Sequence, residues 1–272
     1  MRLKNQVAIV TGGGGGLGEG ICLCLAREGA HVVVSDLNHG LANRVAHKVE
    51  EVGRKALAIQ TDVRLPAQCK NLIEKSLEAM GRIDMLVCCA GVGGFVHRND
   101  SDEELVIENI SEEDWNLTID VNLKGVFLCN RAVAPYFKQN KVGKIVNIAS
   151  LAGRQGFAWL PHYSASKAGV IVLTQAIALQ LAPYNINVNT VCPGLIRTPM
   201  WDRGAEVLNQ SDPTFKGKTP DEVFNLMVEK MIPMKKPQTA EGIGNLVTFL
   251  VSEDAREITG QAINIDGGST FN

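Results

Sequence analysis

Short apolar segments alternate with longer amphipathic segments along most of the chain. The short segments are apolar at nearly every position instead of at every second one, which is typical of β-strands buried on both faces of a sheet. The predicted strands are QVAIVT, HVVVSD, KALAIQTD, IDMLVCCAG, GKIVNIAS, NINVNTVCPG and QAINIDGG. The longer segments between them predict helices over residues 17–29, 40–53, 66–80, 111–138, 163–182 and 239–252.

This alternation predicts an α/β fold, a doubly wound parallel sheet of seven strands with helices on both faces. No linker, low-complexity tract or internal repeat interrupts it, so we expect residues 1–272 to form a single domain. Two long segments depart from the rhythm, at about 92–110 and 195–235. Both follow predicted strand ends, where open parallel sheets bind ligands. We expect them to be substrate loops, with plain surface insertions as the alternative.

Composition narrows the functional classes. The chain is 45% apolar and carries a net charge of -2, which gives no sign of a nucleic-acid or membrane-surface patch. No run approaches the roughly 20 apolar residues of a membrane helix, and MRLKNQVAIV is not a secretory signal. Most of the seven cysteines sit in apolar runs without CxxC spacing. We therefore expect reduced thiols, no metal site and a cytoplasmic location.

A glycine-rich stretch, TGGGGGLG from Thr11 to Gly18, lies between the first predicted strand and the first predicted helix. Such glycines let a pyrophosphate approach the helix N-terminus, where free N–H groups favour an anion. Asp36 ends the next strand, where a carboxylate can accept hydrogen bonds from both ribose hydroxyls and repels a 2′-phosphate. The pattern predicts a dinucleotide-binding domain of the Rossmann type and favours NAD over NADP. Asp62, after the third strand, is either an adenine contact or a helix cap.

The stretch HYSASK places Tyr163 and Lys167 on one face of a predicted helix. A surface pair is the simple interpretation. The alternative is that the lysine makes the tyrosine a better acid–base group, because a nearby positive charge favours the phenolate of a side chain that otherwise titrates near about 10. We interpret the neighbouring His162 as structural.

In this order the motifs resemble those of the short-chain dehydrogenase/reductase family, in its compact single-domain branch. Thr11 to Gly18 meet its TGxxxGxG pattern, DVNLKG carries Asn122, NIAS ends in Ser150, and YSASK is its YxxxK signature. PGLIRTPM and ITGQAINIDGG resemble its nicotinamide-contacting segment and its C-terminal strand. The resemblance covers almost the whole chain.

The resemblance implies the site. Tyr163 is the general acid/base and Ser150 donates a hydrogen bond to the substrate oxygen. Lys167 also binds the nicotinamide ribose, and Asn122 holds a water that links the lysine to solvent. Ser150 as a turn cap and Asn122 as a structural amide are the alternatives. The implied cofactor contacts are Gly12, Gly15, Gly16, Leu17, Gly18, Asp36, Asp62, Val63, Cys89, Ala90, Gly91, Tyr163, Lys167, Pro193, Gly194, Ile196 and Thr198.

One stretch departs from the family pattern. Where the family carries Asn-Ala-Gly after the fourth strand, this chain has CCAG, so Cys89 replaces an amide that supports the cofactor side of the sheet. The change puts that one contact in doubt. A reactive cysteine is the alternative, although no base or cation lies nearby in the sequence.

The sequence thus predicts an NAD-dependent oxidoreductase that interconverts a secondary alcohol and a ketone by hydride transfer. The alternatives are a 3-oxoacyl thioester reductase and a catalytically silent NAD(H)-binding sensor. Trp159, Met200 and Trp201 are predicted walls for an apolar substrate, and the resemblance implies a homotetramer. Four loop arginines are either contacts for an anionic substrate or solvated charges: Arg98, Arg154, Arg197 and Arg203.

Overall fold

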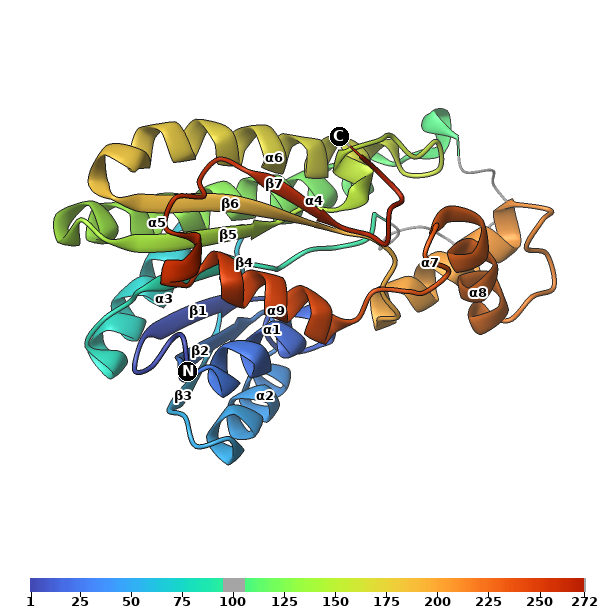
Figure 1. The fold of residues 1–272 in the computed structure, drawn as a ribbon. Coiled ribbons are helices and arrows are strands. Elements are labelled where there is room, and N and C mark those ends of the chain that lie inside the picture. The colour runs from blue at the N-terminus through green and yellow to red at the C-terminus, as the bar shows by residue number, and fades with distance from the viewer. Residues whose placement is uncertain (95–105, 272) are drawn as a thin grey trace.

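A seven-stranded parallel sheet forms the centre of the molecule, whose residues 1–94 and 106–271 are described by a computed structural model (Figure 1). Its strand order is β3-β2-β1-β4-β5-β6-β7, so the direction of winding reverses between β1 and β4. The predicted α/β fold is therefore confirmed. The strands span Val7–Thr11 (β1), His31–Asp36 (β2), Ala56–Gln60 (β3), Met85–Cys88 (β4), Gly143–Ile148 (β5), Ile186–Pro193 (β6) and Ala262–Ile265 (β7).

Helices cover both faces of this sheet. They span Gly16–Arg27 (α1), His39–Glu51 (α2), Pro66–Met80 (α3), Glu112–Ile119 (α4), Gly125–Asn140 (α5), Pro161–Leu181 (α6), Pro199–Ser211 (α7), Pro220–Met231 (α8) and Ala240–Leu250 (α9). The long segment after β6 thus folds into two helices, which lie beyond the ends of the strands, at the right of Figure 1. Residues 95–105 of the other predicted loop, with Arg98, lie outside the described residues.

The sheet separates two hydrophobic cores. Val7 and Ile9 of β1 belong to the core shared with α3, α5 and α6. Ala8 and Val10, which point to the opposite face, belong to the core shared with α1, α2 and α9. Both sets are almost completely buried. This is why the strands read as continuous apolar runs, since successive side chains alternate between two buried faces.

The predicted helix over 111–138 is interrupted. A π-helical turn, Asp120–Lys124, separates α4 from α5. The chain passes close to the segment between β3 and α3 there, because a Cβ on Gly125 would lie 2.7 Å from a methyl carbon of Val63. Single π turns inside helices are frequent at functional sites. This one carries Asn122, which is completely buried.

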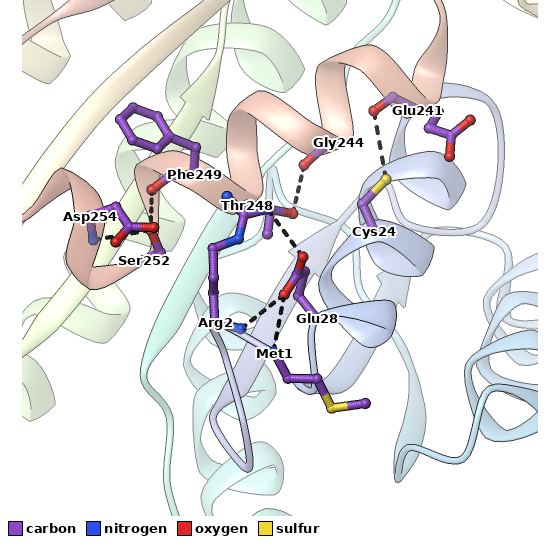
Figure 2. A network of polar contacts seen from close by, with 10 residues as sticks. All are labelled: Met1, Arg2, Cys24, Glu28, Glu241, Gly244, Thr248, Phe249, Ser252 and Asp254. Atoms are coloured by element: carbon purple, nitrogen blue, oxygen red, sulfur yellow. Dashed lines mark hydrogen bonds and ion pairs between the residues drawn. The ribbon is translucent and has the colours of Figure 1, made fainter.

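Helices α1 and α9 cross at very short range. A Cβ on Gly20 would lie 2.6 Å from Ala240, and one on Gly244 would lie 2.6 Å from the sulfur of Cys24. Figure 2 shows the polar contacts beside this crossing, where the Cys24 thiol donates to the carbonyl of Glu241 at 3.6 Å. Glycine is required on both helices for this approach, so the start and the end of the chain are held together.

Among the described residues, one helical stretch has the length and apolar composition of a membrane span. It covers Pro161–Tyr184, with a mean hydropathy of 1.4 over 18 residues. In the structure α6 packs against β6 and α5 and contributes Val170 and Leu181 to the first core. A helix that covers a buried sheet meets the same criterion, so the stretch is weak evidence for a membrane.

Candidate active site

A cavity of about 440 Å³ is lined by residues at the carboxyl ends of β1, β2, β4, β5 and β6 and by residues of α6, α7 and α8. It therefore lies where the strand order reverses, which is the usual ligand site of an open α/β sheet. The glycine-rich turn lies at one end of the cavity. The start of α6 and the α7–α8 unit, residues 199–231, line the other.

The glycine-rich turn is packed too tightly for side chains. A Cβ on Gly18 would lie 2.0 Å from the carbonyl oxygen of Gly12, and one on Gly12 would lie 2.6 Å from the Cα of Ala90. Gly16 has a φ of +51°, in the left-handed region that favours glycine. The cap residue of α1, Gly15, contributes no side-chain hydrogen bond to the first turn. Free backbone N–H groups therefore face the cavity, as a pyrophosphate requires.

Asp36 stands next to this turn at the end of β2. Its Oδ2 accepts from the N–H of Gly14 at 2.9 Å, and its Oδ1 accepts from the N–H of Asn38 at 2.9 Å. These two bonds fix the carboxylate against the turn, while each oxygen retains capacity for a further donor. The residue lines the cavity. Its position suits the ribose that is joined to adenine in a dinucleotide.

Ser150, Tyr163 and Lys167 meet at the other end of the cavity. Burial raises the pKa of Tyr163, and a hydrogen bond with Ser150 partly opposes this rise. The Lys167 Nζ donates to the carbonyl of Ile148 at 3.1 Å and lies 5.7 Å from the centre of the tyrosine ring. Burial lowers the pKa of Lys167 to about 8. Without a cofactor, burial therefore changes the pKa of Tyr163 more than the nearby charge of Lys167 does.

Ser150 also caps the turn Leu151–Gly153, because its Oγ accepts from the N–H of Ala152 at 3.1 Å. The cap and the contact with Tyr163 fix the hydroxyl in place. The turn-cap interpretation and the catalytic interpretation are thus compatible.

Asn122 fastens the backbone that follows β4. Its Oδ1 accepts from the N–H of Val92 at 2.8 Å, and its Nδ2 donates to the carbonyl of Val92 at 3.0 Å and to Ser166 at 3.3 Å. A Cβ on Gly91 would lie 3.3 Å from the Asn122 Oδ1 and 3.6 Å from the Lys167 Nζ. The amide therefore holds one wall of the site and lies close to the lysine, behind the residues that line the cavity.

The comparisons with known proteins agree with this geometry. The short chain dehydrogenase family profile matches residues 6–207. The chain belongs to this family. The relatives include the BbsD subunit of a hydroxy(phenyl)methylsuccinyl-CoA dehydrogenase from Thauera aromatica, 36% identical over 100% of this chain and 99% of the relative.

A 3-oxoacyl-acyl-carrier-protein reductase from Thermotoga maritima is 34% identical over 98% of this chain and 99% of its own. Among solved structures, an NAD⁺-bound xylitol dehydrogenase superimposes with a TM-score of 0.89 at 29% identity, over 98% of this chain and 100% of its own. This short-chain dehydrogenase is therefore expected to bind a nicotinamide dinucleotide, which the glycine-rich turn and the uncapped N-terminus of α1 fit.

The structure brings most of the predicted site residues of this short-chain dehydrogenase together. The residues at the cavity wall are Gly12, Gly15, Gly16, Leu17, Gly18, Asp36, Cys89, Ala90, Gly91, Ser150, Tyr163, Lys167, Pro193, Gly194, Ile196 and Thr198. Asp62 and Val63 are not among them. The Asp62 carboxylate accepts from the Arg64 guanidinium at 2.6 Å and from the Arg64 N–H at 3.0 Å. It closes a turn ahead of α3, whose cap residue is Leu65.

Cys89 lines the cavity and His162 is buried at the start of α6, and neither has the properties of a nucleophile or a base. Burial raises the pKa of Cys89 to about 12, so the thiol is protonated at neutral pH and lacks the thiolate of a reactive cysteine. The His162 Nε2 lies 3.1 Å from the carbonyl oxygen of Gly94, and burial lowers the pKa of the ring. The histidine joins α6 to the segment after β4, in line with a structural role.

The three predicted substrate walls, Trp159, Met200 and Trp201, do line the cavity. Other apolar lining residues were not singled out in the sequence: Leu41, Val92, Phe157, Leu160, Leu195, Met227 and Met231. The apolar face of α8, read with its capping box at Thr219 and Glu222, was the one available signal for the two methionines.

Proposed function

We propose that this short-chain dehydrogenase is an NAD-dependent oxidoreductase that interconverts a secondary alcohol and a ketone. The observation that carries the proposal is the meeting of Ser150, Tyr163 and Lys167 in one cavity with the glycine-rich turn. A binding protein needs the turn but has no use for a tyrosine that is hydrogen-bonded to a serine and placed beside a buried lysine.

The bound dinucleotide would accept hydride from the carbinol carbon and bring a positive charge to the site. In alcohol oxidation Tyr163 takes the hydroxyl proton as the carbinol C–H bond breaks, and in ketone reduction it returns that proton. Ser150 donates a hydrogen bond to the substrate oxygen and offsets the charge that develops there. Lys167 stabilises the phenolate and binds the ribose.

The pKa of Tyr163 gives this scheme a requirement. Desolvation raises that pKa, so Lys167 and Ser150 alone do not make the phenol a base at neutral pH. A bound oxidised dinucleotide would supply a further positive charge to the site, which would lower the pKa. We therefore expect proton transfer only in the complex of protein and cofactor.

Asp36 supports NAD as the cofactor instead of NADP. Its carboxylate is held by two backbone N–H groups beside the glycine-rich turn, where a 2′-phosphate would bring a second negative charge. Arg44 is the nearby cation, and its guanidinium donates to the Glu19 carboxylate at 2.8 Å and to the carbonyl of Gly14 at 3.1 Å. Because Arg44 is paired with the Glu19 carboxylate, it is not a free cation for a 2′-phosphate.

The experiment that tests the proposal follows reduced cofactor with NAD and NADP against secondary alcohols, polyols, hydroxysteroids and hydroxyacyl thioesters. With the preferred alcohol we expect Tyr163→Phe to lose about 100- to 10,000-fold in kcat, because the ring remains but the acid–base group is gone. NADH affinity should stay within about threefold, since the substitution keeps the ring and removes only the hydroxyl. A Phe variant with a rate near that of the wild type would contradict the assigned role.

Two alternatives are separated by the same panel. Preferential reduction of a 3-oxoacyl thioester would favour the thioester reductase. Tight NADH binding without turnover of any substrate would favour the sensor. We also infer a cytoplasmic location and a homotetrameric assembly. The assembly is supported by the exposed apolar side chains of Phe127 on α5 and of Val172 and Leu179 on α6.

A further inference from the structure

Aromatic rings and thioethers surround the substrate end of the cavity. Phe157 and Trp159, just ahead of α6, have ring centroids 5.7 Å apart. The α7–α8 unit adds side chains from both of its helices. We refer to these residues as the aromatic–thioether wall: Phe157, Trp159, Met200, Trp201, Met227 and Met231.

The α7–α8 unit has its own small core, which holds this wall in shape. Trp201 meets the ring of Phe224 edge to face, with centroids 5.3 Å apart. Val223 and Ile232 are completely buried behind them. Trp201 and Met227 therefore belong to a packed surface, and Trp159 and Met231 pack against it. Phe157 and Trp159 come from the segment between β5 and α6.

Among the described residues, charge is nearly absent from the substrate end of the cavity. The charged side chains of this part of the chain that line the whole cavity are Asp36, at the adenosine end, and Lys167, beside the tyrosine. Lys167 is engaged by a backbone carbonyl. An anionic substituent placed against the six wall residues would lose its hydration without gaining an ion pair from them.

The three loop arginines that the structure describes do not place a cation at the wall. Arg154 donates to Asn264 at 2.9 Å and to the carbonyl of Ala262. Arg197 is bonded to Asp202 and to Asp221, the latter at 2.7 Å, and lies over the ring of Phe224.

Arg203 pairs with Glu206 at 3.1 Å. None of the three lines the cavity. Each described arginine of the predicted set is therefore directed to a protein acceptor outside the wall.

We propose that the large substituent of the substrate is an uncharged aromatic group, which packs against the aromatic–thioether wall while the carbinol or carbonyl oxygen meets Ser150 and Tyr163. Rings prefer the edges and faces of other rings, and thioether sulfur contacts ring edges favourably. The proposal rests on the proposed function, because it places the reacting oxygen at those two residues. It goes beyond that function because it names the chemical class of the large substituent on the reacting carbon.

A binding experiment tests the proposal without relying on turnover. Tyr163→Phe protein saturated with NADH is titrated calorimetrically with acetophenone, cyclohexyl methyl ketone and 4-acetylbenzoate. We expect acetophenone to bind most tightly and the cyclohexyl ketone about 2- to 10-fold more weakly, because it fills similar space without aromatic contacts. The benzoate should bind at least about 30-fold more weakly than acetophenone, since its carboxylate would be buried unpaired.

A benzoate that binds within threefold of acetophenone would overturn the uncharged part of the proposal. A cyclohexyl ketone that binds as tightly as acetophenone would overturn the aromatic part, and undetectable binding of all three would overturn both. The proposed function fails separately, if Tyr163→Phe keeps its turnover, and the order of affinities would still decide the present proposal.

A pair of variants sharpens the test. Met200 lines the cavity yet is 44% exposed, so a polar side chain can be placed there without opening the α7–α8 core. Met200→Arg brings a cation to the wall, whereas Met200→Gln changes polarity without adding charge. We expect Met200→Arg to reduce the ratio of the 4-acetylbenzoate Kd to the acetophenone Kd by about tenfold or more. Met200→Gln should leave this ratio nearly unchanged. Equal narrowing by both would show that charge is not what excludes the benzoate.

Discussion

The two ends of the cavity are built by different means. At the glycine-rich turn the backbone makes the site, through uncapped N–H groups and glycines that leave no room for a Cβ. At the α7–α8 unit side chains make it, through rings and thioethers on helices that come after β6. A backbone site depends on a few invariable geometric requirements. A side-chain wall can be rebuilt residue by residue, so the first end fixes the cofactor and the second is free to set the substrate.

The largest expected effect is at the backbone end. Gly18→Ala places a Cβ 2.0 Å from the carbonyl oxygen of Gly12, and the atom in its way is backbone. We expect a loss of about 3 kcal/mol or more in the free energy of unfolding, because α1 has to move away from the turn.

Gly15→Ala is the matched control for this change. A Cβ there meets nothing closer than 4.0 Å, and the backbone is extended. It should change stability by less than about 1 kcal/mol. Urea titrations of both variants without cofactor make the comparison, and equal losses would mean that the short contact at Gly18 does not constrain the turn.

The next effect concerns the choice of cofactor. Asp36→Asn removes a charge with little change in shape, and we expect the ratio of kcat/KM for NAD to that for NADP to fall by about 10- to 100-fold. Asp62→Asn is the control, because that carboxylate is held by Arg64 and does not line the cavity. The control should leave the ratio unchanged. An unchanged ratio in Asp36→Asn would mean that another group discriminates between the cofactors.

Lys167 links the site to stability at alkaline pH. Its pKa is lowered from 10.5 to about 8 by burial. Between these values the unfolded chain binds the proton and the folded protein does not, so the contribution of Lys167 to the free energy of unfolding rises with pH across that window. We expect this contribution to grow by about 1 to 3 kcal/mol from pH 7.5 to 10 in the cofactor-free protein. Buried cysteine thiols such as Cys22 and Cys129, whose pKa is raised, contribute with the opposite sign, so the lysine is measured by comparison with a variant.

Urea titrations at both pH values, repeated on Lys167→Met, isolate this contribution. The cysteines act in both proteins, so the difference in free energy of unfolding between wild type and variant should shift by about 1 to 3 kcal/mol in favour of the wild type over this pH range. The same pH dependence in wild type and variant would show that Lys167 does not contribute.

The smallest effect lies in the α7–α8 unit. Within residues 1–94 and 106–271, the buried indole N–H of Trp201 has no hydrogen-bond partner, while its ring packs on Phe224. Trp201→Phe removes an unsatisfied donor together with part of a ring, two changes of opposite sign. We expect the melting temperature to stay within about 4 °C of the wild type, as for a change below about 1 kcal/mol. A larger loss would show that the N–H is satisfied in solution.

The same contrast explains what the sequence could reveal. Continuous apolar strands and the alternation with helices were sufficient for the sheet, since both follow from local periodicity. The glycine-rich turn and Asp36 could be predicted because backbone geometry limits which residues fit. Met227 and Met231 could not, because the inward face of α8 depends on how the α7–α8 unit docks. The π turn at Asn122 and the direction of the Tyr163 pKa shift also arise only from packing.

The crossing of α1 and α9 has a consequence for folding of the chain during its synthesis on the ribosome. Cys24 and Glu241, which meet there, are 217 residues apart. At a synthesis rate of 5 to 20 residues per second, the first helix waits roughly 10 to 40 seconds for its partner. Until then the side of α1 that packs against α9, with Gly20 and Cys24, stays uncovered in the nascent chain. The earliest-made part of the cofactor site is thus completed last, and a ribosome that stops before α9 releases a chain whose dinucleotide turn lacks its support.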